Sequence, residues 1–145
     1  MTGNSFVYVT YIATTPEKLW EALTSGEFTK KYFFGRELQS DWTEGSNVIF
    51  RNEKGDVTEE KGTVLQSEPY RMLSFRFEMP RSPNEMRELW PKVTYELQPM
   101  GMTVKLMVKH EDLLEQDMNS ITNGWPLILS GLKSLLETGS ALQLG

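Results

Sequence analysis

The residues that could carry out acid–base or nucleophilic chemistry are few in this chain. His110 is the only histidine, and it follows a predicted strand just before Glu111 and Asp112. A histidine that acts as a general base normally needs an orienting partner and a target within reach. No serine or cysteine nucleophile motif accompanies His110. We therefore predict no catalytic residue and interpret His110 as the cap of a strand end.

Other polar side chains could orient a ligand. Thr10 and Tyr95 fall at positions predicted to face inward, and Arg36 and Glu37 flank the start of another strand. We interpret Arg36 and Glu37 as a surface ion pair, which contributes little to stability. A cyclase-like or hydrolase-like enzyme would need these inward-facing groups and His110 to meet in one cavity, together with Arg36.

Metal and nucleotide sites are not indicated. The sequence has no cysteine, no H-x-x-x-H pair, no D-x-[DN]-x-[DN]-G loop and no glycine-rich phosphate loop. Glu59 and Glu60 are adjacent in a predicted strand, so their side chains should point to opposite faces. A further acidic cluster is interpreted as a solvated connector and comprises Glu111, Asp112, Glu115 and Asp117. We predict no metal and no cofactor.

Aromatic and aliphatic residues are better placed to provide a function. Several share one inward-facing parity on different predicted strands, and others lie on one face of a predicted helix. They would line a pocket for an apolar or aromatic ligand, or they would form an ordinary core, and counting aromatic residues does not separate the two. The predicted ligand-binding residues are Tyr8, Thr10, Tyr32, Phe33, Phe50, Phe75, Phe77, Trp90, Tyr95, Trp125, Ile128, Leu129 and Leu132.

The main element that must position these residues is the last apolar stretch, 121–137. Its apolar residues recur at spacings of three and four, which is the period of a helix with one apolar face. They are Ile121, Trp125, Ile128, Leu132, Leu135 and Leu136, and the stripe is widened by Leu127 and Leu129. We predict a long helix that begins between Met118 and Trp125, ends before Gly139 and packs against a sheet.

Most of the chain before this helix is predicted to form the sheet. Alternating and β-branched segments predict strands at 6–12, 37–41, 47–51, 57–67, 71–78, 93–98 and 102–109. Two short helices are predicted between the first two strands, one starting at Pro16 and one at 27–34. Because short loops join most strands, the sheet should be antiparallel and strongly curved around the long helix. The predicted fold class is therefore α+β.

The segment 79–90 is the least regular part of the chain. Two prolines and mixed charge predict a loop, but Met79, Met86, Leu89 and Trp90 are apolar. These residues would form a flexible lid over a cavity, because methionine adapts to different shapes. Alternatively, the loop folds onto its own apolar residues.

Composition limits the remaining possibilities. A chain of 145 residues suits one domain spanning 1–145. The net charge of −5 disfavours binding to nucleic acid or to anionic membranes. The start of the sequence has no basic segment followed by a long apolar run, and no run is long enough to span a bilayer. We expect a cytoplasmic protein that is a monomer or a weak homodimer.

Two stretches carry a family resemblance. TTPEKLWEALTSGE, after the first strand, resembles the start of START-like (SRPBCC) helix-grip proteins, which share the fold of the birch-pollen allergen. GWPLILSGLKSLLETG at 124–139 is similar to the terminal helix of the family named for the activator of the heat-shock protein 90 ATPase. The chain departs from that family at Thr10, where an arginine is common, and at 31–34, where a tryptophan is common.

The resemblance implies a fold and a cavity between the long helix and the sheet, and it names no catalytic motif. The family includes small-molecule binders, polyketide cyclase relatives, toxin-resistance proteins and chaperone activators, so membership does not decide function. Our first hypothesis is a protein that binds a hydrophobic small molecule. The second is an interaction module that acts as a chaperone activator or stress-response protein, and Val7, Val9 and Tyr11 suggest a patch for it. The third is the enzyme described above.

Overall fold

The computed structural model describes residues 4–80, 82 and 85–142. Within them the strands are β1 (Asn4–Ile12), β2 (Glu37–Gln39), β3 (Asn47–Arg51), β4 (Val57–Glu68), β5 (Met72–Glu78), β6 (Lys92–Met100) and β7 (Thr103–Leu113). The helices are α1 (Pro16–Thr24), α2 (Gly26–Tyr32), the 3-10 turn η1 (Glu115–Asp117) and α3 (Met118–Thr138). This is the order of elements that the sequence predicts, with η1 added.

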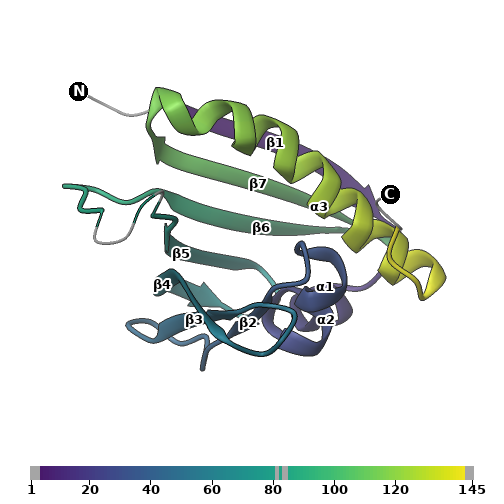
Figure 1. The fold of residues 1–145 in the computed structure, drawn as a ribbon. Coiled ribbons are helices and arrows are strands. Elements are labelled where there is room, and N and C mark those ends of the chain that lie inside the picture. Colours follow the sequence, from purple (N-terminus) through teal and green to yellow (C-terminus); the bar gives the residue numbers. More distant parts are fainter. Residues whose placement is uncertain (1–3, 81, 83–84, 143–145) are drawn as a thin grey trace.

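All seven described strands form one antiparallel sheet in the order β1-β7-β6-β5-β4-β3-β2. The two strands that flank α1 and α2 in the sequence therefore lie at opposite edges. Figure 1 shows the sheet curving beneath α3, with α1 and α2 together at one end. The predicted curved α+β sheet that grips one helix is confirmed.

The helix α3 buries the face that its spacing predicts. Trp125, Leu129 and Leu132 are at most 2% exposed, and Gly139 ends the helix with a φ of 90°, which favours glycine. Leu127 was predicted to widen the buried stripe, and this is wrong: its side chain is 45% exposed. It lies too far round the helix from the sheet to be covered.

The short helices close one end of the sheet. The Thr15 hydroxyl accepts a hydrogen bond from the Lys18 N–H, and Pro16 occupies the first turn, where its missing N–H costs nothing. The Tyr32 hydroxyl donates to the Ala22 carbonyl at 2.7 Å, which fixes α2 against α1. This contact places Tyr32 and the following Phe33 on the inner side of the molecule.

Gly62 lies where β4 packs closely against its neighbour in the sheet. A Cβ at this position would lie 2.2 Å from the Arg76 carbonyl oxygen of the neighbouring strand β5. Only a glycine lets β4 and β5 approach so closely.

The end of β7 differs from the prediction. The strand continues to Leu113 rather than ending near Lys109, because the inward alternation of Val104, Leu106 and Val108 passes on to His110. His110 is therefore inside the strand and fully buried. Its interpretation as a cap of the strand end is wrong.

The predicted solvated connector after His110 is also wrong in part. Glu111 and Asp112 belong to β7, and Asp117 is buried at 3% exposure at the end of η1.

Candidate functional site

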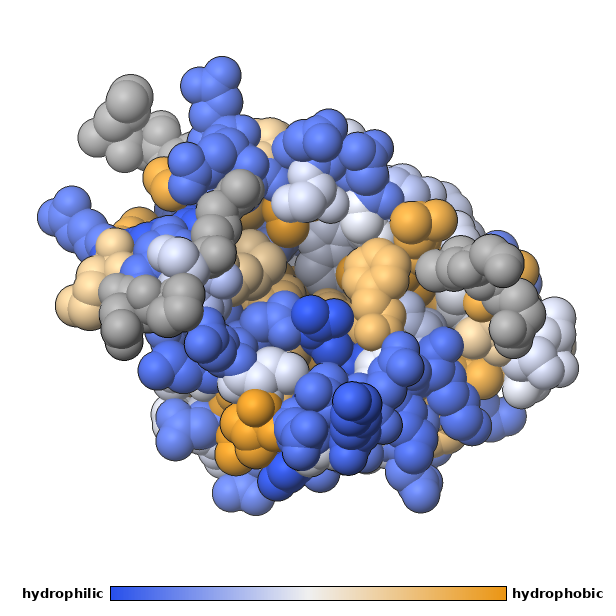
Figure 2. All heavy atoms as spheres, in the orientation of Figure 1, coloured by the Kyte–Doolittle hydropathy of each residue, from blue (hydrophilic) through white to orange (hydrophobic). Residues whose placement is uncertain are grey.

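A cavity of about 190 Å³ lies between the first half of α3 and the strands beneath it. Figure 2 shows a hollow on this face, with orange apolar residues in its wall and blue hydrophilic residues along its lower edge. Its lining comprises Phe33, Phe34, Arg36, Glu60, Phe77, Met79, His110, Ser120, Ile121, Gly124, Trp125 and Ile128.

Four of the predicted ligand-binding residues line this cavity: Phe33, Phe77, Trp125 and Ile128. The Phe33 ring meets the Trp125 ring edge-on at 5.9 Å between centroids. The strand β5, the helix α3 and the turn after α2 therefore bring residues distant in the sequence into one wall.

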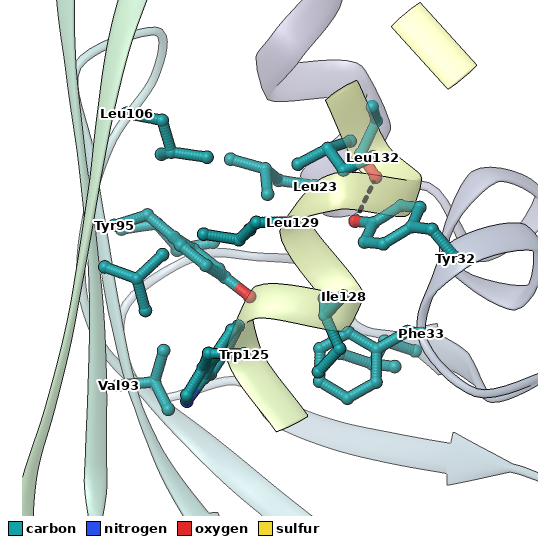
Figure 3. Packing of buried hydrophobic residues seen from close by; sticks show 14 of the residues in the cluster. Leu23, Tyr32, Phe33, Val93, Tyr95, Leu106, Trp125, Ile128, Leu129 and Leu132 are labelled. Carbon is teal, nitrogen blue, oxygen red and sulfur yellow. Dashed lines mark hydrogen bonds between the residues drawn. The ribbon is translucent and has the colours of Figure 1, made fainter. Parts of the chain in front are cut away.

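The other predicted residues lie elsewhere. Six of them are buried in the core outside the cavity lining, and part of this group appears in Figure 3: Tyr32, Phe50, Phe75, Tyr95, Leu129 and Leu132. Tyr8, Thr10 and Trp90 are partly exposed and do not line the cavity. Burial raises the pKa of the Tyr95 hydroxyl, and it also raises that of Tyr32, so both stay neutral.

His110 is a buried polar residue of the cavity lining. The Trp125 Nε1–H donates a hydrogen bond of 3.0 Å to His110 Nδ1. The imidazole also stacks on Phe77, with 6.0 Å between ring centroids and planes 8° apart. The other nitrogen, Nε2, is buried and has no hydrogen-bond partner among the described residues.

The His110 ring is neutral at ordinary pH. Burial lowers the pKa of His110 to about 4, against an opposing effect of Asp117. Since the indole N–H can only donate, Nδ1 must be the unprotonated nitrogen, and Nε2 carries the proton. The side chain therefore offers a hydrogen-bond donor and is poorly suited to act as a base.

Arg36 and Glu60 supply the charges of the lining. The Arg36 guanidinium forms an ion pair with the Glu60 carboxylate, and both side chains are partly buried. The predicted pairing of Arg36 with Glu37 is therefore wrong. Arg36 follows α2 and Glu60 lies on β4, so their meeting depends on the folding of the sheet.

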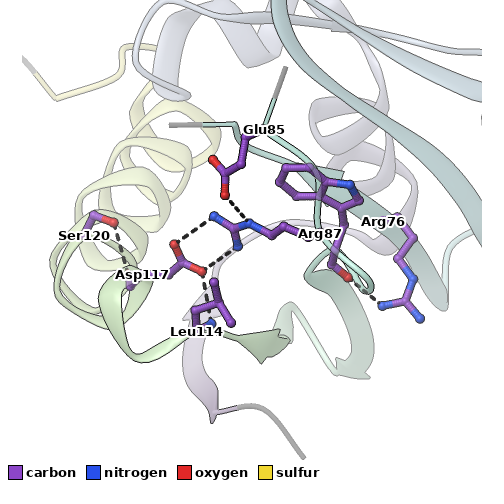
Figure 4. Close-up of polar contacts among 7 residues, drawn as sticks. Arg76, Glu85, Arg87, Leu114, Asp117 and Ser120 are labelled. Carbon is purple, nitrogen blue, oxygen red and sulfur yellow. Dashed lines mark hydrogen bonds and ion pairs between the residues drawn. The ribbon is translucent and has the colours of Figure 1, made fainter. Parts of the chain in front are cut away.

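A second ion pair lies near the start of α3. The Arg87 Nη1 donates to Asp117 Oδ2 at 2.9 Å and its Nε donates to Glu85 at 2.8 Å, as Figure 4 shows. The side chains of Arg87 and Asp117 are each 5% exposed, and the guanidinium also lies 4.7 Å from the centre of the Trp90 ring. These contacts attach the described end of the loop to η1.

The loop 79–90 covers the cavity less than a lid would. Met79 lines the cavity, but Met86 is 90% exposed and Leu89 is 51% exposed, so neither packs on it. Residues 81, 83 and 84 of the predicted loop lie outside the described residues.

The predicted ligand-binding residues do not include His110, Phe34 or Gly124, which also line the cavity. The inward parity of β7 could have placed His110 inside, because it continues the alternation of Val104 to Val108. No alternation or helical spacing in the sequence predicts that Phe34 and Gly124 line a cavity. Gly124 leaves space in the helix wall, since a Cβ there would contact only Phe34, at 3.9 Å.

The described residues contain no group of three or more histidine or acidic side chains placed to hold a metal ion. None of the helices in the described ranges is long and apolar enough to cross a membrane.

A curved antiparallel sheet gripping one long helix, with two short helices after the first strand, defines the START-like helix-grip class of proteins. The chain belongs to the family described as activator of Hsp90 ATPase homolog 1-like protein, which it matches over residues 13–137. A comparison with curated proteins finds no match.

Solved structures show the same fold. ChR145 from Cytophaga hutchinsonii is 29% identical, with a TM-score of 0.74 over 96% of this chain and 97% of that one. MLL2253 from Mesorhizobium loti is 23% identical, with a TM-score of 0.76 over 92% and 97% of the two chains. The Aha1 dimer from Colwellia psychrerythraea is 19% identical, with a TM-score of 0.76 over 94% and 98%. The last two likenesses concern the fold alone.

Proposed function

We propose that this protein binds a hydrophobic small molecule in the cavity between α3 and the sheet. The observation that carries the proposal is the lining: aromatic and aliphatic side chains form the wall, and a few polar groups converge on one space. Apolar walls with a small number of placed polar groups are typical of ligand sites.

The volume favours a small ligand. About 190 Å³ exceeds the roughly 150 Å³ of an engineered apolar cavity that binds benzene. It is smaller than the roughly 300–1,000 Å³ of sites for drug-sized ligands. We infer a ligand with one ring, or with a short aliphatic chain.

Native mass spectrometry of the freshly purified protein, with analysis of its organic extract, is the direct test. A co-purified molecule at stoichiometric amount supports the proposal and gives its chemical class. If the mass is that of the bare chain, ethylbenzene is added and binding is followed through the Trp125 indole N–H resonance. If neither ethylbenzene nor acetophenone changes this resonance up to its solubility limit, the proposal is contradicted.

A matched pair of variants locates the binding. Gly124→Leu places a side chain in the cavity, because a Cβ at Gly124 has open space before Phe34. Thr122→Leu adds the same side chain at an exposed position of the same helix. The first substitution should abolish ethylbenzene binding and the second should leave it unchanged, with circular dichroism confirming that both fold.

A second candidate function is favoured by one observation. Val7, Val9 and Tyr11 project from the outer side of β1, and each is between 39% and 51% exposed. This row would suit a protein partner, and the family description suggests a chaperone. Stimulation of the ATPase rate of purified Hsp90 by this chain, lost in Val9→Lys, would support that function.

The remaining sequence hypotheses gain less support. An enzyme would draw on Thr10 and Tyr95, but these do not line the cavity with His110 and Arg36. A cytoplasmic location stays a prediction of the sequence.

A further inference from the structure

One polar atom at the cavity lacks a partner. His110 is 0% exposed, and its Nε2 has no hydrogen-bond partner among the described residues. A buried polar hydrogen that stays unpaired costs about as much as a lost hydrogen bond, so native structures rarely keep one. An unpaired group beside a cavity therefore indicates a missing partner.

The surroundings determine what that partner must be. Trp125, on α3, donates a hydrogen bond to His110 Nδ1. Phe77, on β5, stacks on one face of the imidazole ring. Both residues also line the cavity. The remaining polar edge of His110 is an N–H, so its partner must be a hydrogen-bond acceptor, and the cavity that His110 lines is a space that could hold one.

We propose that His110 Nε2–H donates a hydrogen bond to a carbonyl oxygen of the bound ligand, so that the cavity selects a small, neutral, apolar molecule that carries a carbonyl group. This inference rests on the proposed function and names the ligand class. His110 is then a binding residue, with Trp125 as the residue that fixes its proton on Nε2.

The charges around the cavity favour a neutral ligand over an anion. Among the described residues the lining contains one guanidinium and one carboxylate, and Arg36 and Glu60 neutralise each other. Asp117 is the acidic group that acts on His110 from η1, and it is paired with Arg87. A carboxylate ligand would have to break this ion pair to reach the Arg36 guanidinium, whereas a carbonyl needs only the N–H of His110.

Three probes of similar size test the proposal: acetophenone, ethylbenzene and benzoate. Acetophenone and ethylbenzene differ mainly in the carbonyl, so the ratio of their dissociation constants reports the hydrogen bond. We expect this ratio to change about tenfold in His110→Leu, in favour of ethylbenzene. The desolvation of the carbonyl is the same in both proteins and cancels. His110→Gln keeps an N–H donor near the position of Nε2 and should retain most of the preference for acetophenone.

The outcomes separate the two proposals. If neither neutral probe binds the wild-type protein, the proposed function fails, and this inference fails with it. If both bind and the ratio is unchanged in His110→Leu, only the assignment of His110 is overturned. Tighter binding of benzoate than of acetophenone would also overturn it and would assign recognition to Arg36.

A measurement on the wild-type protein covers the case in which His110→Leu does not fold. The carbonyl stretching frequency of bound acetophenone is recorded by infrared spectroscopy. It should lie below the value in an alkane solvent, because a hydrogen bond weakens the C=O bond. A frequency equal to the alkane value contradicts the proposal.

Discussion

At the scale of single residues, His110 links the stability of the fold to pH. Its pKa is lowered to about 4 in the folded protein, whereas an unfolded chain binds this proton near pH 6.5. Between these values the unfolded state binds more protons, so the free energy of unfolding falls as the pH drops from about 6.5 to about 4. Asp117 opposes the shift, because its charge favours the protonated ring.

Urea denaturation at about pH 7 and about pH 4.5 measures this effect. The wild-type protein should lose more stability over this interval than His110→Gln, which has no imidazole to titrate. The carboxylates of the chain titrate in both proteins and cancel in the difference. Equal losses in the two proteins would show that His110 is not buried in its neutral form.

Two glycines of α3 give opposite expectations for the same substitution. A Cβ at Gly124 meets only Phe34, at 3.9 Å, so Gly124→Ala should raise the free energy of unfolding by about 0.5–1 kcal/mol through helix propensity. A Cβ at Gly131 lies 3.2 Å from the Tyr32 Cβ, and the hydroxyl of Tyr32 is held by Ala22. Gly131→Ala should therefore be less stable than Gly124→Ala. Urea midpoints in the reverse order would contradict this account of the cavity wall.

At the scale of elements, the ion pair of Arg87 and Asp117 joins the loop to the start of α3. Both side chains are 5% exposed. Arg87→Met keeps the aliphatic stem over Trp90 but removes the guanidinium that pairs with Asp117 and Glu85. It should cost about 3 kcal/mol of stability, the usual scale for breaking a buried pair.

The control for this variant is Arg71→Met. Arg71 pairs with Glu68 at 2.6 Å, but its side chain is 73% exposed, so water and salt screen the pair. Its urea midpoint should match that of the wild-type protein. If Arg87→Met also matches the wild type, the pair does not fix the loop to η1.

The same elements show what the sequence can and cannot predict. Local alternation placed Phe77 and Trp125 correctly on inward faces, because a strand repeats every two residues and a helix every 3.6. Arg36 and Glu60 meet across two elements, and so do Arg87 and Asp117. Such pairs depend on strand register and on the path of a loop, which no local pattern contains. The cavity also depends on Gly124 of α3 lying opposite Phe34 in the turn after α2. These two residues are far apart in the sequence, so no local pattern predicts that they meet.

At the scale of the whole molecule, the sheet has two unequal edges. β2 has three residues, whereas β1 has nine and carries Val7, Val9 and Tyr11 on its outer side. A long apolar edge strand offers unpaired backbone groups to a second strand. Lys105 and Lys109 face these residues across β7 and limit the association by their charge.

We therefore expect weak self-association of this chain through β1, measured by sedimentation equilibrium. Val9→Lys should abolish it, because a charge would be placed at the centre of the exposed row. Ile49→Lys is the matched control: Ile49 is 40% exposed, like Val9 at 39%, but lies on β3, away from the β1 edge. Loss of association in both variants would assign the effect to net charge. Loss of association in Val9→Lys alone would assign the association to the β1 edge. A strictly monomeric wild-type protein would contradict the prediction.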